Sequence, residues 1–362
     1  MLRPVDGMDC HLLGNCRKHV TLLPNDVPMN PDTLSIVIPT FNRNDKLANL
    51  IRSYRSFLPD SARILLIDDC SPTPIAETLQ AEGLIPDNRI TITRNVVNFG
   101  LAANIIECFK QCSTEWMWLM SDDDAVSRES YTQITKVLQD VSQDCIFVNF
   151  SSSLYARDHA YYTTGVTELL NQLDSVNAFR NLLFMSTGCY RVQTFRNSIR
   201  FGYQYAYSLA PHLAMLFTSM TDRKAYFSPE KIIDQGYPEN GWSAVNFQMI
   251  KGALLELPLP WTDQLFTHFA TILSNDYNDD ETYFKRILLG SAMNPGKYEV
   301  FLFKTIIARN PYRKLSPIKR AKRLLFLFIL QNPRFIFLYK LLRKDLPNIK
   351  TNKDHLYRHH RI

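Results

Sequence analysis

Three consecutive aspartates, Asp122, Asp123 and Asp124, are the residues of this 362-residue chain best suited to chemistry. They follow an apolar run at 116–120, which is typical of a buried strand. Neighbouring carboxylates at a strand end repel one another, and a divalent cation neutralises them most simply. Their oxygen atoms suit Mg²⁺ or Mn²⁺, which commonly bridge to substrate phosphates. The alternative is a solvated acidic turn in which Asp123 or Asp124 caps the following helix.

Polar and aromatic residues also follow other apolar runs. Asp69, the second carboxylate of an Asp-Asp pair, could accept a hydrogen bond from a uracil-like base or from a ribose hydroxyl. Phe41 offers an aromatic face on which a base could stack. Gly100, two residues after Asn98, precedes a predicted helix whose N-terminus is a natural anion site. Taken singly, each of these residues could instead serve a turn, a helix start or the core.

Short apolar runs alternate with amphipathic segments between residues 34 and 150. The predicted strands are 34–38, 63–67, 89–93, 116–120 and 145–150, and the predicted helices are 45–58, 74–81, 101–112 and 129–141. This alternation indicates an α/β fold with a mostly parallel sheet covered by helices on both faces. Ligands bind such sheets at the carboxyl ends of the strands, where the residues described above fall.

Four segments in this order resemble family 2 glycosyltransferases of the GT-A fold. They are SIVIPTFNR (35–43), LLIDDCS (65–71), NFGLAANI (98–105) and WLMSDDDAV (118–126). The resemblance implies a nucleoside-diphosphate sugar donor, a divalent metal and inversion at the anomeric carbon. The form SDDD is most similar to bacterial enzymes that build surface polysaccharides such as O-antigen or capsule. A hexosyl- or deoxyhexosyltransferase is therefore expected.

The resemblance also implies roles for individual residues. The nucleotide sugar would be bound by Pro39, Thr40, Phe41, Asn42, Asp69, Asn98, Gly100 and Asp122. Asp122 and Asp123 would meet ribose, diphosphate and metal, with Asp124 as a competing metal ligand. Many relatives carry an acidic residue where Met120 stands, so the division of roles among the three aspartates stays open.

The general base is harder to place. Relatives often carry a Glu-Asp pair before a helix of the acceptor half, and an acidic residue there takes the proton of the acceptor hydroxyl. This chain has no such pair, and the segment at 207–213 occupies the corresponding place. His212 is therefore the candidate base, with Asp222 and Asp234 as alternatives. A histidine that is simply satisfied at a helix start is another interpretation of His212.

Three parts are predicted along the chain. Residues 1–33 form an irregular leader, and residues 34–240 form the catalytic domain, with a donor half at 34–150 and an acceptor half at 151–240. Residues 241–362 form a helical C-terminal region with a basic amphipathic tail. The candidate helices of this region are 243–255, 261–273, 279–290, 297–308 and 316–345.

The C-terminal tail concentrates positive charge. From Lys304 to Ile362 there are sixteen Lys or Arg residues against two Asp or Glu, in a chain of net charge +6. Within 313–344, basic clusters surround two apolar runs that are each too short to span a bilayer. We expect the tail to lie among lipid headgroups, although a helix packed on the catalytic domain is the alternative.

The expected localisation is the cytoplasmic side of a bacterial cell membrane. Seven cysteines, an odd number, favour a reducing compartment, and the first residues lack the apolar stretch of a signal peptide. The expected acceptor is a hydroxyl of a lipid-linked glycan. A sugar-nucleotide-binding protein without catalysis is the rival function. Binding of nucleic acid is less favoured, because no recognised motif accompanies the basic tail.

Overall fold

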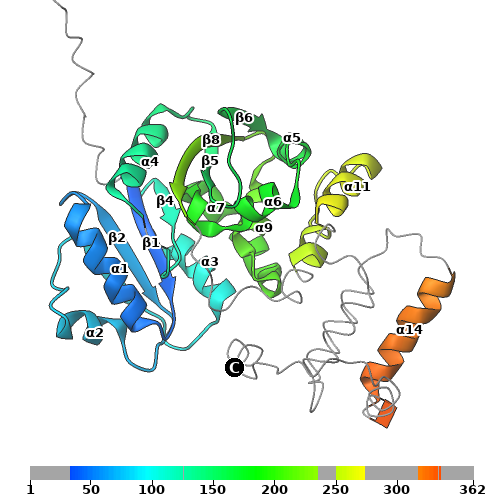
Figure 1. Cartoon of the computed structure of the whole chain (residues 1–362), viewed down its shortest axis with the longest axis horizontal. Coiled ribbons are helices and arrows are strands. Elements are labelled where there is room, and N and C mark those ends of the chain that lie inside the picture. The colour runs from blue at the N-terminus through cyan, green and yellow to red at the C-terminus, as the bar shows by residue number, and fades with distance from the viewer. Residues whose placement is uncertain (1–32, 125, 235–249, 274–316, 333, 336–362) are drawn as a thin grey trace, which may run out of the picture.

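The computed structural model describes residues 33–124, 126–234, 250–273, 317–332 and 334–335. Its body is an eight-stranded sheet with the strand order β3-β2-β1-β4-β7-β5-β8-β6 (Figure 1). The strands are β1 (Leu34–Thr40), β2 (Arg63–Asp68), β3 (Ile90–Arg94), β4 (Trp116–Leu119), β5 (Cys145–Ser152), β6 (Tyr161–Thr164), β7 (Gly188–Arg191) and β8 (Lys224–Ile233).

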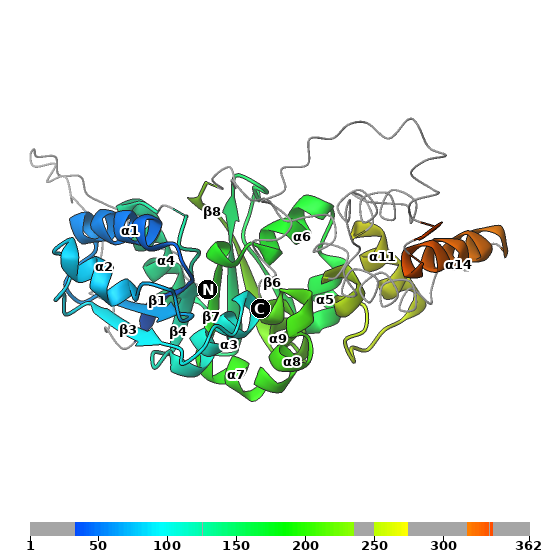
Figure 2. The same cartoon turned by 90° about the horizontal axis from the view of Figure 1, so that it is seen from below.

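Helices cover both faces of this sheet. The described residues include the helices α1 (Asn44–Phe57), α2 (Ile75–Ala81), α3 (Leu101–Gln111), α4 (Arg128–Asp140), α5 (Gly165–Asn171), α6 (Val176–Leu183), α7 (Val192–Asn197), α8 (Ile199–Gln204), α9 (Pro211–Ser219), α11 (Asp263–Ile272) and α14 (Pro317–Gln331), of which α14 lies apart from the sheet (Figure 1). Two short 3-10 helices, η1 (Met185–Thr187) and η2 (Ala206–Ser208), precede β7 and α9. Figure 2 shows α1 and α4 on one side of the sheet and α3, α7, α8 and α9 on the other.

Strand direction decides which loops meet. β1 runs parallel to β2 and β4, and β2 runs parallel to β3. β7 is antiparallel to both β4 and β5, while β5 is parallel to β8 and β6 is antiparallel to β8. The carboxyl ends of β1, β2, β3, β4, β5 and β8 therefore lie at one edge of the sheet. We call this edge the carboxyl edge.

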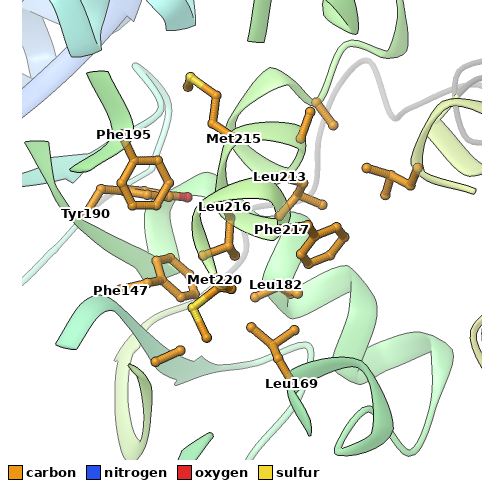
Figure 3. Packing of buried hydrophobic residues seen from close by; sticks show 14 of the residues in the cluster. Phe147, Leu169, Leu182, Tyr190, Phe195, Leu213, Met215, Leu216, Phe217 and Met220 are labelled. Carbon is orange, nitrogen blue, oxygen red and sulfur yellow. The ribbon is translucent and has the colours of Figure 1, made fainter. Parts of the chain in front are cut away.

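Alternating side chains of the central strands fill two cores. On β4, Trp116 and Trp118 pack with α1, α2 and α4, whereas Met117 and Leu119 pack with α3 and the helices of the second half. This alternation is the two-residue period of a strand that is buried on both faces. α9 is buried on nearly all sides, and Figure 3 shows its Leu213, Leu216 and Phe217 among side chains of several other elements.

The predicted α/β fold is confirmed, with one strand or helix for each of the nine segments predicted between 34 and 150. Of the C-terminal candidates, 261–273 corresponds to α11, and part of 243–255 is helical at residues 250–254. The candidate at 316–345 is interrupted, because α14 ends at Gln331 and Asn332 precedes a proline, which disfavours helix in the residue before it. Residues 334–335 are helical, and 336–345 lie outside the described residues. The leader up to residue 32 and the candidates at 279–290 and 297–308 lie outside the described residues. Within the described part of the chain, no helix has the length and apolar character needed to cross a membrane.

Candidate active site

The acidic cluster, Asp122, Asp123 and Asp124, lies just beyond β4 at the carboxyl edge. Thr40 Oγ1, at the end of β1, donates a hydrogen bond of 2.7 Å to Asp122 Oδ2. The guanidinium of Arg43 approaches two carboxylates at once, with Nη1 2.6 Å from Asp122 Oδ1 and Nη2 2.5 Å from Asp123 Oδ2. The Arg43 guanidinium therefore bridges Asp122 and Asp123.

The third aspartate is turned into the protein. Asp124 Oδ2 accepts a hydrogen bond of 2.6 Å from the hydroxyl of Ser186, which belongs to η1. Ser186 Oγ also accepts a hydrogen bond from the backbone N–H of Ser121, and the Ser186 carbonyl accepts one from Trp118 Nε1. Ser186 thus fixes both the start of the acidic cluster and its last member. Asp124 consequently supports the shape of the cluster from the side of η1.

The three carboxyl groups differ in acidity. Burial raises the pKa of Asp122 to about 6, although Arg43 and the Thr40 hydroxyl oppose this rise. Burial also raises the pKa of Asp124 to about 6. For Asp123, burial acts in the same direction, but the Ser121 hydroxyl and Arg43 outweigh it and lower the pKa. Two of the three groups therefore hold their protons unusually well, because burial disfavours their charged form.

This arrangement fits a divalent cation held by two protein carboxylates. Asp122 and Asp123 already direct one oxygen each toward a shared positive group. Mg²⁺ and Mn²⁺ commonly bind through one or two carboxylates, with waters and substrate phosphates completing the coordination. In the described ranges no three His, Cys, Asp or Glu side chains converge as a ligand set. The residues therefore fit a metal site in which Asp122 and Asp123 supply two ligands and the substrate would supply the others.

Asp69 holds the loop that leads into α3. Its carboxylate is buried and accepts hydrogen bonds from Asn95 Nδ2 at 2.8 Å, Phe99 N at 2.9 Å and Gly100 N at 2.8 Å. Asn98 Oδ1 also accepts from Gly100 N. The backbone of Gly100 has a φ of 81°, in a region that favours glycine. The predicted contact between Asp69 and a base stays a prediction, and the observed contacts add a structural role.

The other predicted nucleotide-binding residues lie nearby, at the ends of β1 and β3. Pro39 and Thr40 are the last residues of β1, and both are buried. Phe41 follows them and is 40% exposed, so its ring is available for stacking. The backbone N–H of Asn42, a residue with a φ of 53°, donates to Ser71 Oγ and ties this turn to the segment after β2.

The three candidate bases occupy different environments. His212 is 2% exposed in α9, its Nε2 lies 3.1 Å from the Leu183 carbonyl oxygen, and burial lowers its pKa to about 4. Asp222 precedes β8 and therefore lies at the edge opposite the acidic cluster. Asp234 directly follows β8, lies at the carboxyl edge and pairs with Lys231 Nζ at 2.5 Å. Position and exposure thus favour Asp234 as the general base. His212 stays a prediction, and its burial in the core does not favour that role.

Two residues of the site were not predicted. Arg43 stands in the segment SIVIPTFNR, but nothing in that segment indicates a partner 79 residues away. Ser186 lies in a part of the sequence without a recognisable pattern, and its hydroxyl meets a carboxylate 62 residues away. A basic residue three positions after a strand end was the one signal available for Arg43. No such signal marked Ser186.

The matched family agrees with this geometry. Residues 35–206 match the model of the family described as glycosyl transferase family 2. These residues form a family 2 glycosyltransferase domain. The glycosyltransferase domain so defined contains the acidic cluster, Arg43, Asp69 and Ser186, and it ends before His212.

Known proteins resemble the chain at low sequence identity. An uncharacterized glycosyltransferase from Haemophilus influenzae is 24% identical over 106 residues, which are 29% of this chain and 34% of that protein. The match thus spans about a third of that relative. The crystal structure of residues 1–349 of S. aureus TarS in complex with UDP-GlcNAc is 14% identical, with a TM-score of 0.57 over 85% of this chain and 92% of that chain. The full S. aureus TarS structure has a TM-score of 0.52 at 13% identity and covers 83% of this chain and 55% of that chain. These likenesses show that the glycosyltransferase domain shares its fold with TarS.

Proposed function

We propose that this protein transfers a sugar from a nucleoside-diphosphate sugar to a hydroxyl group of an acceptor. The observation that carries the proposal is the pair Asp122 and Asp123. Both carboxylates face the Arg43 guanidinium at the carboxyl edge of a family 2 glycosyltransferase domain. A related fold has been crystallised with UDP-GlcNAc, which makes UDP-sugars the first donors to test.

Under this proposal, different residues of the chain bind the metal, position the nucleotide and take up the proton. Asp122 and Asp123 would hold Mg²⁺ or Mn²⁺, which supplies positive charge beside the departing diphosphate. Thr40 orients the Asp122 carboxylate, and Asp69 keeps the loop at Phe99 and Gly100 in place beside the base pocket. An inverting transfer further needs a group that takes the proton of the acceptor hydroxyl on the opposite face of the sugar. Asp234 is the candidate that its place at the carboxyl edge supports.

Nucleotide binding tests the donor assignment without requiring the acceptor. We expect UDP to bind more tightly with Mn²⁺ than with a chelator present, because a cation held by Asp122 and Asp123 would offset the negative charge of the diphosphate. Isothermal titration of the full chain with UDP, in Mn²⁺ and in chelator, measures this difference. Equal affinity in both conditions would contradict the metal assignment. Absence of binding by any nucleoside diphosphate would contradict the proposed function.

The proposed acceptor is a lipid-linked glycan for a surface polysaccharide, reached by docking of α14 on a membrane. Leu324 and Phe328 are one helical turn apart, and Ile318 and Leu325 are two turns apart, so these exposed side chains share one face. The ring of Phe328 also lies 5.0 Å from that of Phe335, which extends the apolar surface past the end of α14. An exposed apolar face in a basic segment supports an interfacial helix. In Figures 1 and 2, α14 lies beyond α11, far from the nucleotide half of the sheet.

Vesicle co-sedimentation tests the membrane proposal. The full chain should sediment with vesicles containing anionic lipid, and high salt should weaken this without abolishing it, since only the charge contribution is screened. The double variant Leu324→Ser with Phe328→Ser should bind about tenfold or more weakly, because it removes two large apolar side chains from the interface. The variant Thr271→Ser in α11 is the control. Full-length protein that stays in the supernatant would contradict the proposal and favour a soluble acceptor.

A further inference from the structure

Arg43 occupies the place between two carboxylates that a divalent cation would use. It follows the end of β1 and directly precedes α1, and its side chain is 35% exposed. Asp122 is nearly enclosed, with 5% of its side chain exposed, whereas Asp123 is 35% exposed. The guanidinium therefore closes the outer side of a carboxylate pair whose inner side is packed against Thr40.

We propose that Arg43 is an exchangeable counter-ion: it neutralises Asp122 and Asp123 before the cation arrives, and it moves to the diphosphate when the cation binds. The inference rests on the proposed function and concerns the order of events at the same site. A carboxylate oxygen that faces a guanidinium at 2.5–2.6 Å has no room for a metal ion in that direction. Two positive groups that close together also repel each other. Binding of the cation must therefore displace Arg43.

The surroundings give the displaced side chain a destination. An open hollow of about 450 Å³ lies beside Arg43 and is lined by Asn42, Arg43, Asn44, Asp45, Lys46, Thr73 and Thr78. Arg43 already forms part of this wall, and Lys46 adds a second positive charge. The hollow also contains the first turn of α1, a helix of 14 residues whose N-terminal end favours negative charge. A guanidinium that leaves the carboxylates can thus pair with a diphosphate oxygen from this side.

The exchange predicts opposite effects on the two ligands. Without nucleotide, Arg43 competes with the cation, so removing its charge should tighten cation binding. With the cation bound, Arg43 contributes to the diphosphate site, so the same change should weaken nucleotide binding. A merely structural arginine would weaken both or neither. Arg43 is thus expected to link metal and nucleotide binding, so that each ligand favours the other.

Mn²⁺ binding to the full chain, followed by electron paramagnetic resonance without nucleotide, tests the first half. Arg43→Gln should bind Mn²⁺ at least about fivefold more tightly than the wild type. UDP titrated in saturating Mn²⁺ should bind the variant at least about fivefold more weakly. Arg52→Gln is the matched control, because Arg52 lies in α1, the helix that Arg43 precedes, and pairs with Glu82 instead, and it should change neither affinity. Arg43→Lys should fall between wild type and Arg43→Gln, since one ammonium group cannot form the same planar bridge.

The outcomes separate this inference from the proposed function. Unchanged or weaker Mn²⁺ binding by folded Arg43→Gln, or no Mn²⁺ binding by either protein, would overturn the exchange. Tighter Mn²⁺ binding without a loss of UDP affinity would overturn the transfer to the diphosphate. If the wild type bound Mn²⁺ but no nucleotide, the proposed function would fail, while the Mn²⁺ comparison would still decide whether Arg43 competes for the carboxylates.

Discussion

Replacing Asp123 by alanine should lower the rate of sugar transfer by roughly a hundredfold or more, because the loss of a metal ligand removes several kcal/mol of transition-state stabilisation. Asp123 is the best position for this test, since its side chain is partly exposed and contacts Arg43 and Ser121. The protein should therefore stay folded. Asp124→Ala should also impair transfer, but it breaks the buried contact with Ser186 and mixes stability with catalysis.

The control for Asp123 is Asp140→Ala. Asp140 is exposed at the end of α4. It lies near the start of β5, at the edge of the sheet opposite the carboxyl edge, because α4 runs back between the two edges. Its removal should leave turnover unchanged. Release of nucleoside diphosphate, measured at saturating donor and Mn²⁺, compares the proteins. A loss of only about threefold in Asp123→Ala, less than 1 kcal/mol, would count against its role as a ligand.

Replacing Asp69 by alanine should reduce the free energy of unfolding by about 3 kcal/mol, because three hydrogen bonds to a buried carboxylate are lost together. Two of the donors are the backbone N–H groups of Phe99 and Gly100, and water can satisfy them only in part. The loop before α3 should become loose as a result. Nucleotide affinity should then fall more than the rate of the chemical step, since the base pocket is remote from the reacting carbon.

Urea unfolding and nucleotide titration measure these two effects. Asp174→Ala is the control, because Asp174 also accepts two side-chain hydrogen bonds, from Tyr155 and Ser175, but is exposed. Its cost should stay within about 0.5 kcal/mol. If the Asp69→Ala protein kept both its stability and its nucleotide affinity, Asp69 would have neither the structural role nor the binding role.

The first half of the fold could be predicted because its central strands, β1 and β4, are buried on both faces. The runs 34–38 and 116–120 are almost wholly apolar, and a polar residue follows each of them within two positions, where the chain leaves the sheet. These two features were enough to place Thr40, Asp69 and Asp122 at one edge. The partners of those residues were not predictable in this way. Arg43 and Ser186 reach the acidic cluster only through tertiary packing, which leaves no periodic pattern in the sequence.

The second half was harder because two of its strands, β6 and β7, have only four residues each and run antiparallel to their neighbours. β7 has four residues and inserts between β4 and β5 against their direction, which a simple strand–helix alternation does not predict. The same feature makes the general base hard to choose from the sequence. Asp222 and Asp234 lie twelve residues apart at opposite ends of β8, so only one can face the acidic cluster. His212 begins an almost wholly apolar helix, and the core encloses it together with that helix.

Donor turnover is the measurement that tests the central claim most directly. The full chain is incubated with a panel of nucleoside-diphosphate sugars, beginning with UDP-sugars, and release of the nucleoside diphosphate is followed with Mn²⁺ and with a chelator. The proposed function predicts that at least one donor is consumed in Mn²⁺, that the chelator stops the reaction, and that Asp122→Asn and Asp123→Ala lose it while remaining folded. Tight binding of a donor without turnover under any condition, including added lipid-linked acceptor, would contradict an enzyme and favour a sugar-nucleotide-binding protein. Turnover that the two aspartate variants retain in full would place the chemistry elsewhere in the molecule.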